Sequence, residues 1–81
     1  MKAIDMQIGR TYMWTDPKDF GRDLGVTVRS ISYTSKIVMY ELFGAIEGDR
    51  MINVKSDPDP IRAWGNDYDL PADWPVEDIT H

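Results

Sequence analysis

Apolar and polar residues alternate near the start of the chain, which predicts a β-strand over residues 7–15. Ile8, Tyr12 and Trp14 follow a mostly period-two pattern within this stretch. Side chains on a strand point alternately to its two faces, so these three residues are expected to share the buried face. Gly9 interrupts the pattern and predicts a bulge or a close approach of the backbone.

Three further segments predict a β-meander. Residues 26–33 are rich in β-branched side chains, and residues 36–43 form the most apolar stretch of the chain. Residues 51–54 are again apolar. β-branched and aromatic residues favour strands, so we expect all three segments to pair in sequence order, with the 36–43 strand the most buried. Turns are predicted at residues 34–35 and at residues 47–49, where Gly-Asp is a favoured hairpin pair.

A short helical turn is predicted between the first two strands. Asp16 can cap a helix, and Pro17 suits the first helical position because a missing N–H costs nothing there. Asp19 would favour the first turn through the helix dipole. Gly21 and Gly25 leave room for only one or two turns.

These elements predict a mainly β fold. The arrangement resembles a small antiparallel SH3-like barrel more than an OB-like one, because the strands are short and the turns tight. The resemblance is one of layout, without a family signature. A rolled sheet packed on one short helical turn is the alternative, and an irregular acidic C-terminal segment completes either arrangement.

The composition changes sharply at residue 56. The chain has a net charge of −5, yet its first 55 residues are nearly neutral, whereas residues 56–81 carry one arginine against seven acidic residues. Four of the five prolines also lie in this last segment. We therefore expect a β-rich core domain over residues 1–56 and an acidic, Pro- and Trp-containing segment over residues 57–81, partly packed on the core.

The residues needed for catalysis or metal binding are scarce. The only histidine is His81, the last residue, and there is no cysteine or phosphate-binding glycine loop. The carboxylate pairs Asp16/Asp19 and Asp67/Asp69 are better explained by capping or solvation, because acid–base chemistry needs one carboxylate desolvated in a cleft. We therefore expect no enzyme activity, no cofactor and no metal.

Nucleic acids and membranes are not the expected partners. Lysines and arginines are scattered singly among acidic residues, whereas phosphate binding needs clustered cations. No apolar stretch approaches the roughly 18 residues of a membrane span, and the first residues lack an apolar leader. A cytoplasmic location is expected.

The C-terminal segment combines aromatic and acidic side chains. Aromatic residues anchor protein interfaces and carboxylates attract basic partners, so this combination predicts a recognition surface. Its expected partner-binding residues are Trp64, Asp67, Tyr68, Asp69, Asp73 and Trp74. The alternative is that the aromatic residues of the segment fold over the sheet and complete a small core.

The sequence thus favours a non-enzymatic protein-interaction domain, such as a small regulator or inhibitor of a partner protein with a basic surface. Its small size and lack of a signature also fit a phage or mobile-element product. Two alternatives stay open. One is a structural or assembly subunit that forms a homo-oligomer through strand edges, and the other is a small nucleic-acid-binding β-barrel.

Overall fold

The computed structural model describes residues 1–34, 38–40, 44–46, 51–58, 60–61 and 64–81. Their fold is mainly β, as predicted, and the described residues contain no α-helix. None of the described helical segments is long and apolar enough to cross a membrane. The elements are a 3₁₀ turn η1 (Ala3–Asp5) and the strands β1 (Thr11–Thr15), β2 (Asp23–Thr34), β3 (Val38–Tyr40), β4 (Gly44–Ile46), β5 (Met51–Ser56), β6 (Asp67–Pro71) and β7 (Glu77–Asp78).

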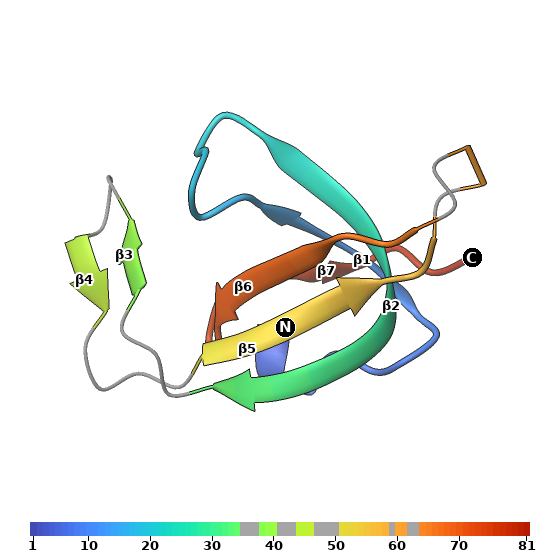
Figure 1. The fold of residues 1–81 in the computed structure, drawn as a ribbon, viewed down its shortest axis with the longest axis horizontal. Helices are drawn as coiled ribbons and strands as arrows, with labels where there is room; N and C mark the ends of the chain where they lie inside the picture. The colour runs from blue at the N-terminus through green and yellow to red at the C-terminus, as the bar shows by residue number, and fades with distance from the viewer. Residues whose placement is uncertain (35–37, 41–43, 47–50, 59, 62–63) are drawn as a thin grey trace.

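Five strands form one antiparallel sheet in the order β6-β5-β2-β1-β7 (Figure 1). The long strand β2 holds the sheet together, because its first part pairs with β1 and its second part pairs with β5. The pairing register shifts between Val28 and Ser30. Such a bulge increases the local twist, which lets one strand serve two halves of a curved sheet.

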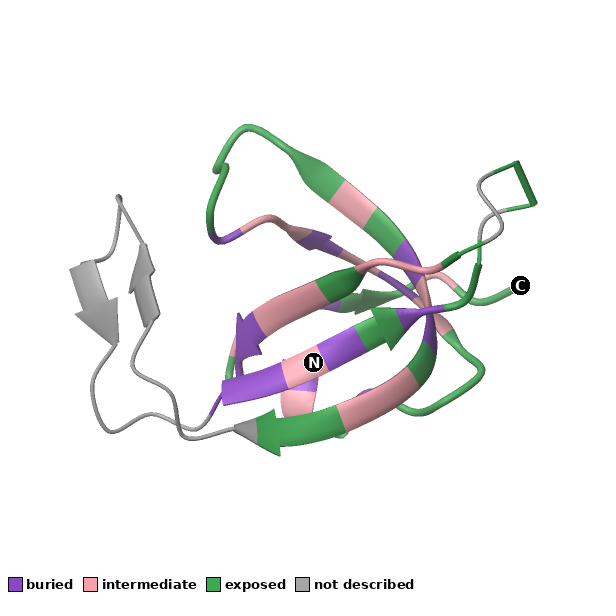
Figure 2. Cartoon of the chain, viewed as in Figure 1, coloured by how far each residue is buried: buried purple, intermediate pink, exposed green. Residues whose placement is uncertain are grey.

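The core lies inside this curved sheet and follows the period-two pattern of its strands (Figure 2). In β1, Tyr12 and Trp14 are buried while the residues beside them are only partly covered. Each fully buried aliphatic side chain contributes about 1.5–3 kcal/mol to folding. The buried cluster is completed by Ala3, Met6, Val26, Val28, Ile52, Val54, Leu70 and Val76.

The edge strands β6 and β7 are joined by residues 72–76 alone, although they lie at opposite ends of the strand order. The N-terminal residues brace this connection. The Ala3 N–H donates to the Trp74 carbonyl at 2.8 Å, and the Ile4 N–H donates to the Ala72 carbonyl at 2.8 Å. The sheet therefore rolls up, but it does not close, because no hydrogen-bonded ladder joins β6 to β7.

The predicted helical turn at Asp16 is wrong. The Asp16 carboxylate accepts a hydrogen bond from the Lys18 N–H at 2.9 Å, and the Asp16 N–H donates to the Arg22 carbonyl at 2.8 Å. The carboxylate bond alone would also suit a helix cap, but the Arg22 N–H donates to the Asp19 carbonyl at 3.0 Å, and together with the Asp16–Arg22 bond this closes a tight turn between β1 and β2. The 3₁₀ turn lies instead at the N-terminus, in η1.

The first strand is shorter than predicted. It begins at Thr11, and Gly9 lies in the turn before it with a φ of +90°, a conformation that side chains other than glycine rarely adopt. Gly9 is therefore not a bulge within the strand. Ile8 lies outside the strand and is exposed, so it does not share the buried face of Tyr12 and Trp14.

The predicted meander is also wrong in its pairing. β5 pairs directly with β2, whereas β3, which lies within the predicted 36–43 strand, pairs with β4 in a separate two-stranded sheet. Local apolar content predicts that a segment is a strand but not which strand it pairs with, and here a distant pairing prevails. The predicted turn at residues 47–49 lies outside the described residues. The side-chain burial predicted for residues 36–43 also lies outside what the structure describes. Thr34 belongs to β2, and the rest of the 34–35 turn also lies outside the described residues.

The prediction that the C-terminal segment is irregular is wrong for part of it, because this part forms strands. Residues 67–71 form β6 against β5, and residues 77–78 form β7 against β1. The prolines do not prevent this, because Pro71 is the last residue of an edge strand, where a missing N–H breaks no ladder.

The contact between β7 and the start of β1 should depend on pH. Arg10 donates from Nε to the Asp78 carboxylate at 2.8 Å, and the Thr80 N–H donates to the other oxygen at 2.9 Å. The Thr80 hydroxyl and N–H, followed by the Arg10 guanidinium, lower the pKa of Asp78 to about 2 from its ordinary value of 3.8. A lowered folded-state pKa means that the ionised carboxylate stabilises the fold above about pH 4, and that this stabilisation is lost towards pH 2.

We therefore expect Asp78→Asn to lower the melting temperature at pH 7 but not at pH 2. It should also speed amide exchange at Ile79, whose N–H donates to the Thr11 carbonyl. Glu77→Gln is the control, because it removes a charge from the same strand and keeps the bond to Arg10. An equal loss of stability at both pH values would contradict this account of Asp78.

Candidate functional site

The loop that joins β5 to β6 is fixed at its base by Ser56. The Ser56 N–H donates to the Asn66 carbonyl at 2.9 Å, and the Asn66 N–H donates to the Ser56 hydroxyl oxygen at 2.8 Å. Ser56 is the one buried polar residue among those described, and these bonds satisfy it. The Asp57 N–H further ties the loop to β2 through the Thr27 carbonyl at 2.9 Å.

Gly65 is required at this position by close packing. A Cβ atom built on Gly65 would collide with the backbone carbonyl group of Ser56. Only glycine lets the two backbones approach this closely. The base of the loop, next to Trp64, is therefore closely packed on Ser56.

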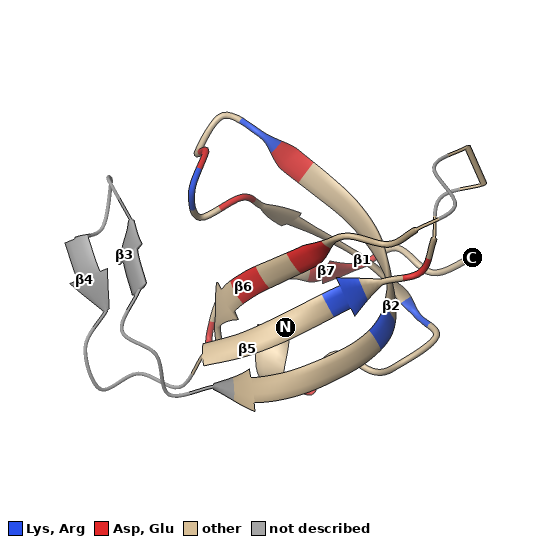
Figure 3. Ribbon diagram, viewed as in Figure 1, with Lys and Arg blue, Asp and Glu red and all other residues tan. Residues whose placement is uncertain are grey.

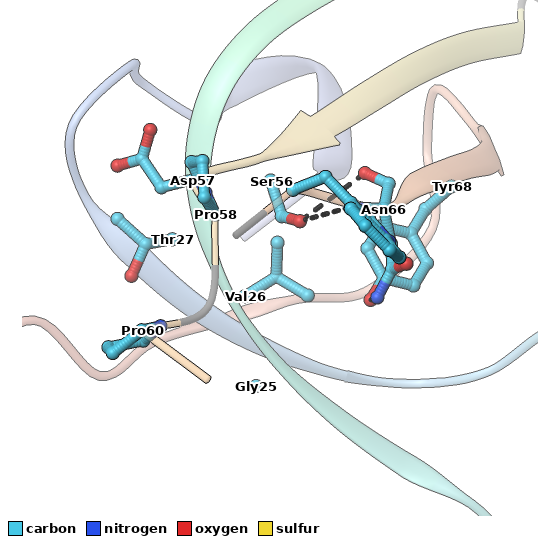
Figure 4. A pocket seen from close by; sticks show the side chains of 10 residues that line it. Gly25, Val26, Thr27, Ser56, Asp57, Pro58, Pro60, Asn66 and Tyr68 are labelled. Atoms are coloured by element: carbon cyan, nitrogen blue, oxygen red, sulfur yellow. Dashed lines mark hydrogen bonds between the residues drawn. The ribbon is translucent and has the colours of Figure 1, made fainter. Parts of the chain in front are cut away.

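A groove of about 230 Å³ lies between this loop and β2 (Figure 4). We call it the loop groove. Its apolar lining comes mainly from aromatic and proline side chains, and its polar groups include a carboxylate and an amide. Its lining residues include Asp57, Pro58, Pro60, Trp64, Asn66 and Tyr68.

Trp64 is the largest exposed apolar side chain of the groove. It is 70% exposed, although it directly precedes Gly65, which packs against Ser56 at the base of the loop. The neighbouring Ile61 is 93% exposed. Large apolar side chains that remain in water on an anchored loop are typical of a binding surface.

A second hollow, of about 210 Å³, lies between β6 and the turn that follows β1. We call it the seam hollow, because it lies where the rolled sheet fails to close. Its apolar side chains are those of Trp14, Pro17, Leu24, Tyr68 and Leu70. The charged residues in its lining are Asp16, Lys18, Asp67 and Asp69.

Tyr68 lines both cavities and packs against Trp14 across the gap between β6 and β1. The two rings meet edge to face, with centroids 5.7 Å apart and an interplanar angle of 85°. The Tyr68 hydroxyl oxygen accepts a hydrogen bond from the Asn66 side chain at 3.3 Å. Within the described part of the chain, Nε1 of Trp14 is buried and has no hydrogen-bond acceptor. An unpaired buried donor costs about 1–3 kcal/mol.

The acidic side chains of β6 have different surroundings. Asp69 accepts a hydrogen bond from the Asn53 side chain at 3.0 Å, across the β5–β6 ladder. Asp67 lies opposite Lys55 in the same ladder, but its exposed carboxylate makes no hydrogen bond or ion pair with the described residues. Figure 3 shows these two acidic positions on β6. Asp67 thus keeps its charge available to a ligand.

The structure brings some of the predicted binding residues together. Trp64 and Tyr68 line the loop groove, and Asp67, Tyr68 and Asp69 line the seam hollow. The other two lie elsewhere. Asp73 is exposed, and Trp74 is half-buried and donates from Nε1 to the Thr15 carbonyl at 2.8 Å.

Several residues that line the two cavities were not predicted from the sequence. Asp57 and Asn66 were not predicted, although they lie at the two ends of the loop before Trp64 and after it. Asp16 was assigned a capping role, but it lines the seam hollow. The alternation of Asp67, Tyr68, Asp69 and Leu70 is the signal that could have revealed β6. The described residues contain no group of three or more side chains arranged to hold a metal ion.

Gly65→Ala should destabilise the fold. The added methyl group must displace the backbone at the base of the loop, and overpacking of this kind costs about 1–3 kcal/mol. Urea denaturation followed by Trp fluorescence measures the change. Gly21→Ala is the matched control, because its Cβ would meet nothing within 4 Å. Equal stability of the two variants would show that the close approach at Ser56 is not required.

The two C-terminal tryptophans should differ in their contribution to stability. Trp74→Phe removes the hydrogen bond to Thr15, so we expect a loss of about 0.5–1.5 kcal/mol in the free energy of unfolding. Trp64→Ala changes an exposed side chain, so we expect a change within about 0.5 kcal/mol. Thermal and urea denaturation of both variants would test this. A larger loss for Trp64→Ala would mean that Trp64 belongs to the core.

Compared with known proteins, the chain matches no protein-family model, no curated protein and no solved structure. The functional argument therefore rests on the two cavities and on the charges around them.

Proposed function

We propose that this chain is a non-enzymatic protein-interaction domain that binds a partner with a basic surface through its acidic and aromatic C-terminal segment. The observation that carries the proposal is Trp64, which is 70% exposed beside the base of a loop that Ser56 and Gly65 pack together. A tryptophan side chain has only two rotatable bonds, so it loses little entropy on binding and can serve as an anchor.

The loop groove supports a protein ligand because of its chemical composition. Pro58, Pro60, Trp64 and Tyr68 offer flat apolar surface, while Asn66 and Asp57 offer polar groups at its margin. Ligand sites combine a mostly apolar lining with a few polar groups that fix orientation. At about 230 Å³ the groove is smaller than the 300–1,000 Å³ of sites for drug-sized molecules, which favours a short stretch of a larger partner.

The charge of the chain supports a basic partner. The net charge is −5, and the described carboxylates near the two cavities include Asp57, Asp67 and Asp69. Complementary charge speeds association and rejects partners of like charge, nucleic acids among them. A regulator or inhibitor of a larger basic protein fits this chemistry. For the rolled sheet, the finer proposal is an SH3-like layout.

A peptide array tests the proposal. The labelled protein is applied to short peptides of random sequence, and we expect the retained peptides to be enriched in lysine and arginine. Trp64→Ala should abolish retention, whereas Tyr33→Ala should not. Tyr33 is a matched control because it is 63% exposed but lies at the opposite end of the sheet, where β2 pairs with the start of β5.

Two results would contradict the proposal. One is that no peptide is retained by the wild-type protein at low salt. The other is that Trp64→Ala retains the same peptides as wild type, which would exclude the loop groove as the binding site.

A further inference from the structure

We propose that the basic partner binds as an extended segment, which adds a strand to the free edge of β2 over residues 23–27. This edge forms one wall of the loop groove. The inference rests on the proposed function, since it states how the partner lies beside Trp64. It depends on backbone hydrogen bonds of β2 and not on the Trp64 side chain, so the two proposals can fail separately.

The first part of β2 has a strand on only one side. β1 pairs with it from Asp23 to Thr27, whereas the ladder with β5 begins at Val28. β5 ends at Ser56, and only the Asp57 N–H continues along β2, through its bond to the Thr27 carbonyl. Among the described residues, the edge of β2 before Thr27 therefore has no strand beside it.

The register of the β1–β2 ladder determines which backbone groups this edge presents. Thr11 and Thr27 lie opposite each other. The Thr11 carbonyl accepts a hydrogen bond from the Ile79 N–H at 2.9 Å, and the Thr27 carbonyl accepts one from Asp57, so the backbone groups of the pair point away from each other. Antiparallel ladders alternate between hydrogen-bonded and non-hydrogen-bonded pairs. Gly25, two residues before Thr27, therefore also directs its N–H and carbonyl away from β1.

These backbone groups belong to the wall of the loop groove. Gly25, Val26 and Thr27 line the groove from β2 (Figure 4). The N–H and carbonyl of Gly25 and the N–H of Thr27 have no hydrogen-bond partner among the described residues. They occupy about 7 Å of strand, since a strand rises about 3.4 Å per residue. An unpaired edge of this kind is a template on which another extended chain forms backbone hydrogen bonds.

The charges at the two ends of this edge favour a basic segment. Asp23 lies two residues before Gly25, and Asp57 lies beyond Thr27; both acidic residues are exposed. The described lining of the loop groove contains no basic side chain. Carboxylates in these positions attract a chain rich in lysine or arginine and repel an acidic one. The acidic edge strand of a second copy is thus a poor occupant.

The two faces of β2 predict the residue pattern of the segment. Val26 is buried and lines the groove together with Tyr68, whereas Gly25 and Thr27 lie on the other face of the strand. An added strand continues the pleat, so its side chains alternate between the same two faces. The expected segment therefore alternates apolar residues, which pack in the groove, with basic residues, which remain in water.

The test is an NMR titration of the ¹⁵N-labelled protein with an acetylated and amidated hexapeptide of alternating lysine and valine. In the free protein, the amides of Gly25 and Thr27 should exchange rapidly. The Val26 amide is the internal control, because it pairs with β1 and should exchange slowly. The hexapeptide should shift the Gly25 and Thr27 resonances in a saturable way and slow their exchange about tenfold at saturation.

Modified hexapeptides separate strand pairing from charge attraction. A strand pairs with one neighbour through the N–H groups of alternate residues only. N-methylation of either all lysines or all valines should therefore weaken binding about tenfold, while N-methylation of the other set should leave it nearly unchanged. The hexapeptide of alternating glutamate and valine should not bind.

The outcomes separate the two proposals. If both N-methylated hexapeptides bind as well as the unmodified one, or if the Gly25 and Thr27 amides do not respond, strand addition is wrong. Loss of hexapeptide binding in Trp64→Ala would still support the proposed function in that case. If the hexapeptide protects both amides equally in wild type and in Trp64→Ala, the edge of β2 binds by itself, and the Trp64 anchor of the proposed function fails.

A second copy of the chain at this edge would give a different result. The Gly25 and Thr27 amides would then exchange slowly in the free protein, and more slowly as the protein concentration rises. That result would overturn the inference, and so would the absence of any binding of the lysine–valine hexapeptide at low salt.

Discussion

The rolled shape of this protein depends on the short connection between its two edge strands. A flat sheet of five strands would place β6 and β7 about 19 Å apart, since neighbouring strands are about 4.7–4.9 Å apart. Residues 72–76 could span about 20 Å, but only if fully extended. They are not extended, because the Trp74 N–H donates to the Pro71 carbonyl at 3.0 Å and makes a turn. The edges must therefore approach each other, and the sheet rolls around its core.

The same constraint creates the candidate sites. The connection brings β6 towards β1 without pairing them, so side chains instead of backbone hydrogen bonds fill the gap. Trp14 and Tyr68 meet there edge to face, and the space beside them is the seam hollow. A closed barrel would satisfy this edge with a ladder and leave less room for a ligand.

The elements that the sequence predicted well are those determined by local alternation. Tyr12 and Trp14 share a buried face because period two is a property of the strand itself. The pairing of β5 with β2 could not be predicted in this way, because it joins segments separated by residues 35–50. The contact of Gly65 with Ser56 is likewise invisible in the sequence. The prolines of the C-terminal segment favour an irregular structure, and they obscure the alternation that forms β6.

Strand β6 contributes both to the core and to the charged surface. Leu70 is fully buried and Tyr68 packs on Trp14, so alternation places Asp67 and Asp69 on the other face of the strand. One short run of residues thus supplies both core and charge, which a chain of this size requires because it buries so little surface. The acidic edge also bears on self-association. Two copies pairing through β6 would bring carboxylates close together, and like charges opposite each other destabilise a sheet. The charges that favour a basic partner therefore also disfavour a homo-oligomer through this edge.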